Sequence, residues 1–249
     1  MNWLLLRGLI REQRHWKGFP DVFGATVDGA KVFCLDHPGI GTEQDRPSPQ
    51  SVAGIMADVR QRWLALREAH SGDWGLFSVS LGSMVGLLWA QTHPGDFRAL
   101  VATGTSVSNL SPFYHRFQAA NIPLIPRMFV TQDTYVRERA ILQATTSGRT
   151  PIDDLARENA SFALPLARLR HTGLSQIYAG SRLKLAPNMP IPLLVLNALG
   201  DRLVDPRCSE RLAAYFKAPL HSHPWAGHDL PLEDPEWVGN QVQQWFKGL

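Results

Sequence analysis

Short apolar runs rich in strand-forming residues alternate along the chain with segments of helical periodicity, and this alternation restricts the fold more than any other feature. The runs occupy residues 3–6, 31–35, 74–79, 99–103, 192–197 and 220–224. Between the second and third runs, Ser51 can cap a helix whose apolar side chains recur with a 3.6-residue period. Alternation of this kind predicts a mostly parallel sheet of about six strands with helices on both faces.

The alternation stops between residues 105 and 188. This interval has a mostly helical pattern interrupted by prolines, and it contains no convincing central strand. We expect a helical cap over 105–188, inserted into a core formed by 1–104 and 189–249. The interval carries ten Lys and Arg against five Asp and Glu, a net charge of +5, whereas the whole chain has a net charge of +3.

Composition excludes several classes of protein. The 249 residues, 44% hydrophobic and 19% charged, are typical of a globular protein with a large core. The chain has no run of basic residues of the kind that binds nucleic acids. No segment approaches the roughly 18 apolar residues of a membrane span, and the first apolar stretch is too short for a signal peptide. Cys34 and Cys208 lack disulfide or metal spacing. We therefore expect a cytoplasmic protein with reduced thiols and no nucleic-acid or membrane partner.

The most specific motif is Ser78-Val79-Ser80-Leu81-Gly82, which lies between an apolar run and a helical pattern. A nucleophile elbow needs this context, because a serine on a tight strand-to-helix turn tolerates only small residues two positions before and after it. Ser78 and Gly82 meet that requirement. The alternative is an ordinary serine-rich strand end, so the motif alone does not decide.

A serine hydroxyl becomes a nucleophile when a nearby base accepts its proton. His228 is the best candidate among nine histidines, since it follows the last apolar run and precedes the C-terminal helical pattern. The imidazole needs a carboxylate to hold its tautomer, and Asp201 follows the fifth run. Asp205 is the alternative acid, but Pro206 follows it and a helix-capping role suits it better. The order Ser80, Asp201, His228 is the order expected of a nucleophile-elbow enzyme.

Acyl transfer also needs two backbone N–H groups that donate to the oxyanion. Leu81 directly follows the predicted nucleophile and begins a helix, so its N–H is one expected donor. Leu9, which follows Gly8 after the first run, is the other. An ordinary turn glycine is the alternative explanation for Gly8.

Four motifs in this order resemble the α/β-hydrolase family, in particular its small cap-bearing members related to carboxylesterases, pimeloyl-ester esterases and proline iminopeptidases. The motifs are Asp36-His37-Pro38-Gly39-Ile40-Gly41, the elbow at Ser80, Gly200-Asp201-Arg202-Leu203-Val204 and Gly227-His228. The resemblance covers nearly the whole chain and implies the α/β-hydrolase fold. Arg7-Gly8 departs from the His-Gly pair usual in the family. Family members normally carry two antiparallel strands before the strand that corresponds to residues 3–6, and we expect a sheet without these two strands.

These residues and the resemblance predict a serine hydrolase that cleaves a small-molecule ester or thioester through an acyl-enzyme on Ser80, without a metal or organic cofactor. Four cap residues are predicted to line its pocket, although packing between cap helices explains them equally well: Phe113, Phe117, Leu124 and Met128. The positive charge of the cap suggests an acidic acyl group or a phosphopantetheine-like carrier, but a solvated basic surface on its helices explains the charge better. A lyase or C–C hydrolase with the same triad, and a non-catalytic ligand-binding homologue, stay open, as does the oligomeric state.

Overall fold

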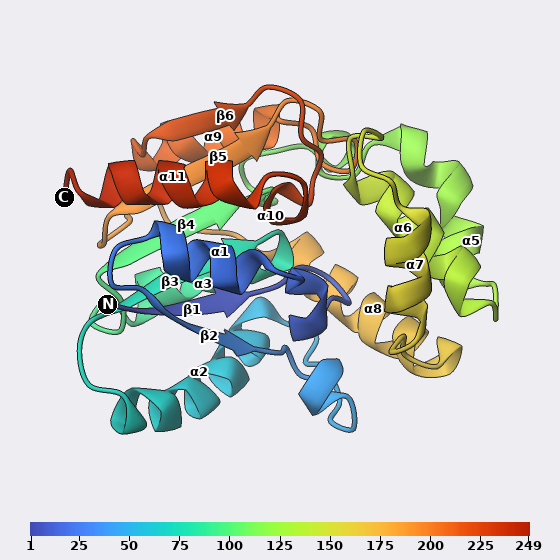
Figure 1. Ribbon diagram of the computed structural model, residues 1–249, viewed down its shortest axis with the longest axis horizontal. Helices are drawn as coiled ribbons and strands as arrows, with labels where there is room; N and C mark the ends of the chain where they lie inside the picture. The colour runs from blue at the N-terminus through green and yellow to red at the C-terminus, as the bar shows by residue number, and fades with distance from the viewer.

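The computed structural model describes residues 1–249 and contains one six-stranded parallel sheet (Figure 1). Its strands are β1 (Asn2–Leu6), β2 (Lys31–Leu35), β3 (Trp74–Val79), β4 (Ala99–Thr103), β5 (Leu193–Ala198) and β6 (Leu220–His223), in the spatial order β2-β1-β3-β4-β5-β6. All five strand pairings are parallel. The predicted sheet is confirmed, and each predicted run lies within one or two residues of an observed strand.

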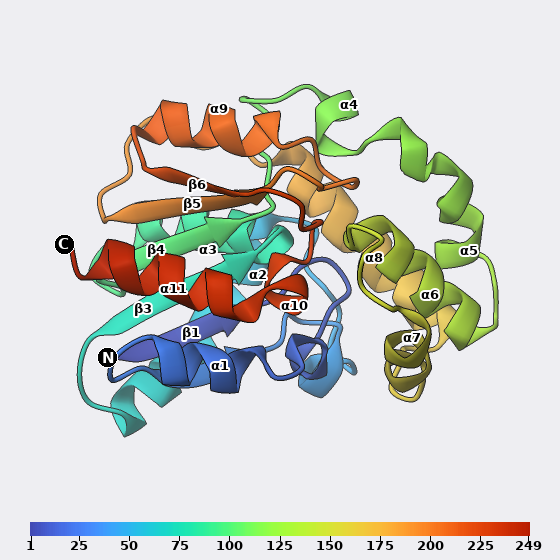
Figure 2. The ribbon, with the colours of Figure 1, turned by 45° about the horizontal axis from the view of Figure 1, so that its top comes forward.

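Helices cover both faces of the sheet, because both faces of its central strands are apolar. Trp3 and Leu5 of β1 pack with α1 (Phe19–Thr26) and α11 (Pro235–Phe246) on one face. Leu4 and Leu6 point to the other face, which is covered by α2 (Val52–Ala69), α3 (Leu81–Thr92) and α9 (Arg207–Phe216). The two helical layers are visible in Figure 2. Successive side chains of a strand point to opposite faces of the sheet, and here both faces are buried. The strands are therefore continuous apolar runs in the sequence.

The regular elements between β4 and β5 are all helices, joined by loops. This interval contains α4 (Phe113–Arg116), η3 (Ala119–Leu124), α5 (Ile125–Phe129), α6 (Thr134–Thr145), α7 (Asp153–Ala160) and α8 (Leu166–Arg182). These helices lie beyond the carboxyl ends of the strands (Figures 1 and 2). Part of this interval has its own small apolar cluster around Met128, Ala140, Ile141 and Ala144, against which Leu124 packs.

Shorter elements complete the chain: η1 (Gln13–Trp16), η2 (Gly41–Glu43) and α10 (Leu230–Glu233). The side chain of Ser51 caps α2 by accepting a hydrogen bond from the Gly54 N–H at 3.0 Å. Cys208 is buried, Cys34 is half-buried, and both are unpaired. None of the helices combines the length and the apolarity that crossing a bilayer requires.

Candidate active site

Ser80 occupies the one-residue turn between β3 and α3. Its backbone has φ 55° and ψ −114°, and residues other than glycine rarely adopt a positive φ. A Cβ atom at Gly82 would lie 2.4 Å from the carbonyl oxygen of Leu6 and 2.6 Å from that of Arg7, so only glycine fits there. Ser78 is buried, and its hydroxyl donates to the Val101 carbonyl at 3.0 Å. Crowding by the neighbouring strands therefore explains both small residues of the motif.

His228 and Asp201 meet at the carboxyl edge of the sheet, from the loops after β6 and β5. His228 Nδ1 lies 2.8 Å from Asp201 Oδ2, and both side chains are only 5% exposed. Asp201 Oδ1 accepts hydrogen bonds from the N–H groups of Leu203 and Val204 at 2.8 and 2.9 Å. These bonds fix the carboxylate, and the carboxylate in turn orients the imidazole. Asp205 pairs instead with Arg207 at the start of α9.

The surroundings of His228 alter its basicity. Burial by itself would lower the pKa of His228, but the negative charge of Asp201 and its hydrogen bond to the ring outweigh this effect. Asp229 adds to the increase, and the pKa of His228 is raised above its usual range. The ring is therefore a stronger base than an isolated imidazole.

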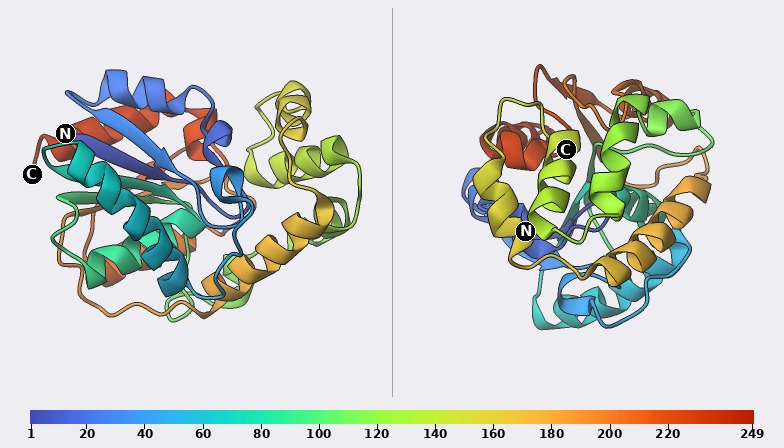
Figure 3. Two further views of the ribbon diagram at one scale, coloured as in Figure 1. Left: turned by 90° about the horizontal axis from the view of Figure 1, so that it is seen from below. Right: turned by 90° about the vertical axis from the view of Figure 1, so that its right-hand side faces the viewer.

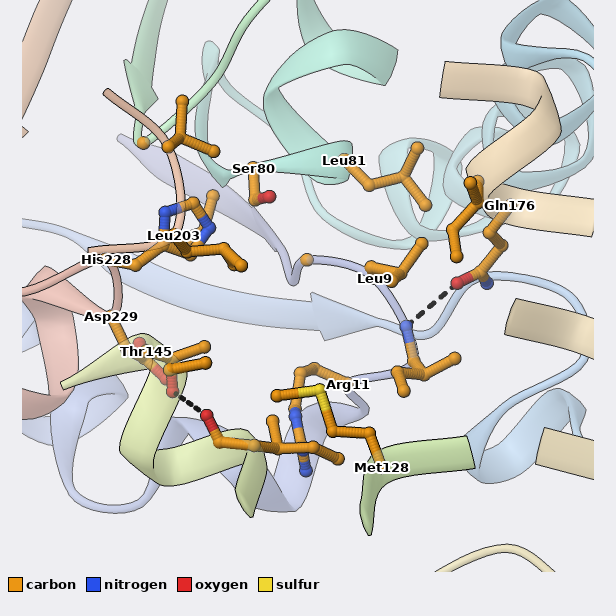
Figure 4. Close-up of a pocket in the computed structure, with 18 of the residues that line it drawn as sticks. Leu9, Arg11, Ser80, Leu81, Met128, Thr145, Gln176, Leu203, His228 and Asp229 are labelled. Carbon is orange, nitrogen blue, oxygen red and sulfur yellow. Dashed lines mark hydrogen bonds between the residues drawn. The ribbon is translucent and has the colours of Figure 1, made fainter. Parts of the chain in front are cut away.

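Ser80 and His228 line the same pocket but are not hydrogen-bonded to each other (Figure 4). The Ser80 hydroxyl makes no hydrogen bond within the protein, and it points to the side of Leu81 rather than toward the imidazole. Gly104, with φ 59°, lets the chain pass close to the ring: a Cβ there would lie 3.2 Å from His228 Cε1. The structure thus brings all three predicted residues together but joins only Asp201 and His228.

The two predicted oxyanion donors flank Ser80. Leu81 is the first residue of α3, where an N–H has no acceptor within the helix, and the Ser80 side chain does not cap it. The Leu9 N–H has no acceptor in the protein. Gly8 brings this loop against the elbow, since a Cβ at Gly8 would lie 3.1 Å from Ser80 Cβ. Both N–H groups are available to a ligand.

A mainly apolar pocket of about 750 Å³ opens above these groups. Leu9, Ser80, Leu81 and His228 line it, together with residues of the helical interval. Of the four residues predicted to line it from that interval, the structure places Phe113, Phe117 and Met128 in its wall. Leu124 is not in the wall: it packs on the small cluster that includes Met128 and Ile141, and those two residues line the pocket instead.

A buried ion pair that sequence reasoning missed connects the loops of Leu9 and His228. The Arg7 guanidinium donates to both oxygens of Asp229, at 2.9 and 2.6 Å, and lies 4.6 Å from the ring centroid of Trp16. His37 Nε2 donates to the Arg7 carbonyl at 2.9 Å, because a carbonyl oxygen can only accept. Burial lowers the pKa of His37 to about 4 and keeps its ring neutral. Two sequence features could have indicated this ion pair: Arg7 stands where the family usually has histidine, and Asp229 directly follows His228.

Glu233 of α10 fixes the His228 loop from the other side, and no sequence signal marks it. Its carboxylate accepts hydrogen bonds from the N–H of Gly227, from the N–H and hydroxyl of Ser147, and from the hydroxyl of Thr150. The Asp229 N–H also donates to the Thr145 carbonyl at 2.8 Å. The loop that carries His228 is therefore attached to the segment that follows α6.

A parallel sheet with an elbow serine, a histidine and a carboxylate at its carboxyl edge defines the α/β-hydrolase class. Residues 25–235 match the family described as "Serine aminopeptidase, S33". The chain belongs to this family of α/β hydrolases, and the resemblance stated from the motifs is confirmed.

Comparisons with known proteins agree with this assignment. A probable proline iminopeptidase from Streptomyces coelicolor is 32% identical over an alignment that covers 44% of this chain and 42% of that protein, less than half of its length. The structure of 2-hydroxy-6-oxo-6-phenylhexa-2,4-dienoate hydrolase from Rhodococcus sp. strain RHA1 is similar with a TM-score of 0.80, 17% identity, and coverage of 99% of this chain and 90% of that one. A thermophilic esterase from Thermogutta terrifontis has a TM-score of 0.73, 19% identity and coverage of 100% and 90%. At these identities the two structures share the fold.

Proposed function

We propose that the protein is a serine hydrolase that cleaves a carboxylic ester or thioester through an acyl-enzyme on Ser80. One observation carries the proposal: Ser80 and His228 line the same pocket, and His228 Nδ1 lies 2.8 Å from the buried carboxylate of Asp201. A pair of this kind has the components needed to activate a serine hydroxyl.

In the proposed reaction, rotation about the Cα–Cβ bond of Ser80 turns its hydroxyl toward His228, since hydroxyl rotamers interconvert readily and catalytic hydrogen bonds are often unformed without substrate. Ser80 Oγ attacks the acyl carbon while His228 Nε2 takes its proton. The N–H groups of Leu9 and Leu81 donate to the oxyanion. His228 then protonates the departing alcohol or thiol, and a water molecule that His228 activates releases the acid.

The pocket favours an ester over the amino-terminal substrate of an aminopeptidase. An α-ammonium group needs an unpaired carboxylate, and Asp229 is the one acidic residue in the pocket wall. Both oxygens of Asp229 already accept hydrogen bonds from Arg7. The wall also contains Arg116 and Arg170, which donate to neutral carbonyls and form no ion pair with a carboxylate, and their positive charges disfavour an ammonium ligand.

We further propose that residues 105–188 act as a cap on the core of residues 1–104 and 189–249. Phe113, Phe117 and Met128 from this interval would contact the acyl group, because they line the pocket that contains Ser80. The same triad could serve a C–C hydrolase or lyase, and product analysis on a panel of esters and β-keto compounds separates these reactions.

Substitution Ser80→Ala tests the proposal. We expect the variant to lose turnover of p-nitrophenyl esters while keeping the circular dichroism spectrum and melting temperature close to those of the wild type. Ser83→Ala is a suitable control within the same helix, since the Ser83 hydroxyl is buried and bonded to the carbonyls of Ser78 and Thr103 and does not line the pocket. Undiminished turnover by Ser80→Ala would contradict the proposal.

A further inference from the structure

The exposed large apolar side chains of this protein are concentrated on two segments. Nine of the eleven lie on residues 113–130, which contain α4, η3 and α5, or on α8. Phe113 is 82% exposed, and Leu174, Ile177 and Tyr178 form one face of α8 at i, i+3 and i+4. Scattered exposed apolar side chains are ordinary, but a concentration of this size indicates a binding surface.

The two segments frame the mouth of the pocket. Phe113, Phe117, Leu174 and Ile177 are all exposed and all line the pocket, so they lie where the pocket meets solvent. In the right-hand view of Figure 3, the green helices of residues 113–130 lie above the orange helix α8. We call the exposed surface of residues 113–130 and of α8 the rim.

Two arginines connect the sides of the rim. Arg116 donates to the carbonyl oxygens of Gly180 and Ser181 at 2.7 and 3.1 Å, and Arg170 donates to that of Phe129 at 2.6 Å. Both guanidinium groups bond to neutral carbonyls, so both keep an uncompensated positive charge at the mouth.

The rim is also free of acidic residues. Neither 113–130 nor 166–182 contains Asp or Glu, and all five acids of the interval 105–188 lie between residues 133 and 158. Of the five rim arginines, Arg168 pairs with Asp45, whereas Arg116, Arg127, Arg170 and Arg182 form no ion pair with a carboxylate. Protruding apolar side chains among unpaired cations are the combination that binds anionic lipid interfaces.

We propose that the rim docks on an anionic lipid surface and that an acyl ester reaches Ser80 from that surface. A lipid surface suits the rim better than an acidic carrier protein does, because an acidic protein would pair with the arginines but would leave the protruding apolar side chains without an apolar environment. Delivery of the ester rests on the proposed hydrolase function, but docking does not. The expectation of no membrane partner rested on the lack of a spanning segment, which does not bear on surface docking.

Vesicle sedimentation with the Ser80→Ala protein tests docking independently of catalysis. We expect binding to vesicles of phosphatidylcholine and phosphatidylglycerol at 7:3, weaker binding at high salt, and little binding to pure phosphatidylcholine. Removal of two rim charges in Arg127→Gln/Arg182→Gln should weaken binding about thirtyfold, from the usual contribution of each basic residue near an anionic surface. Lys31→Gln/Arg98→Gln removes two exposed positive charges at the amino ends of β2 and β4, outside the rim, and is the matched control that should bind normally.

Ile122→Asp/Tyr178→Asp tests the apolar part of the rim and the delivery of substrate. Both residues are exposed and neither lines the pocket. The variant should lose vesicle binding and hydrolysis of a long-chain ester embedded in the anionic vesicles, while it keeps turnover of soluble p-nitrophenyl acetate. Equal binding to neutral and anionic vesicles, binding that the rim substitutions leave unchanged, or self-association of the chain through this face would overturn docking. If Ser80→Ala binds vesicles but the wild type hydrolyses no ester, the proposed function fails and docking stands.

Discussion

Asp201 acts on His228 in two ways, through its negative charge and through the hydrogen bond at 2.8 Å. Both favour the protonated ring and raise the pKa of His228, against the burial that lowers it. A general base must be unprotonated, so the rate of ester hydrolysis should fall as the pH drops through this raised pKa.

Asp201→Asn should therefore change both the rate and its pH dependence. The amide can hold the wrong tautomer, so we expect kcat to fall by about 10⁴. It also removes the charge that raises the pKa of His228, so the acidic limb of the remaining activity should move to lower pH. A pH profile of kcat/KM measures both effects. Asp205→Asn is the control, and a larger loss from that variant would identify Asp205 as the functional acid.

At the scale of secondary-structure elements, the junction of β3 and α3 depends on close approach to the end of β1. Gly82→Ala places a Cβ against two backbone carbonyls, which cannot move without shifting β1 and its loop. We expect a loss of about 2 kcal/mol in the free energy of unfolding and a large loss of turnover, since the same loop carries Leu9. Chemical denaturation measures the first effect. Gly95→Ala, with no neighbour within 4 Å, should be nearly neutral.

The loops after β1 and β6 are coupled by the ion pair of Arg7 and Asp229. Arg7→Met leaves a buried carboxylate without its partner, at a cost of about 3–5 kcal/mol in the free energy of unfolding. The double variant Arg7→Met/Asp229→Leu removes both charges and should recover much of that stability. Because the pair positions both Leu9 and His228, we expect the stable double variant to keep a lowered kcat. Full activity in that variant would show that the pair has no positioning role.

At the scale of the whole molecule, local patterns predict the sheet and the elbow, because strand periodicity and small-residue spacing depend on near neighbours in sequence. The approach of Asp201 to His228 is also predictable, since parallel strands bring their carboxyl ends to one edge. The pairing of Arg7 with Asp229 cannot be predicted from the sequence, because the two residues are 222 positions apart and no periodic pattern marks them. The position of Leu124 is likewise set by packing among helices, which an apolar residue alone does not specify.

Labelling with a fluorophosphonate tests the central claim most directly, because the reagent reacts only with a serine that a neighbouring base activates. We predict one adduct per chain, located on Ser80 by peptide mass spectrometry, with labelling abolished by Ser80→Ala and slowed by orders of magnitude in His228→Ala. An unlabelled protein, or an adduct on a different residue, would contradict the assignment of Ser80 as the nucleophile.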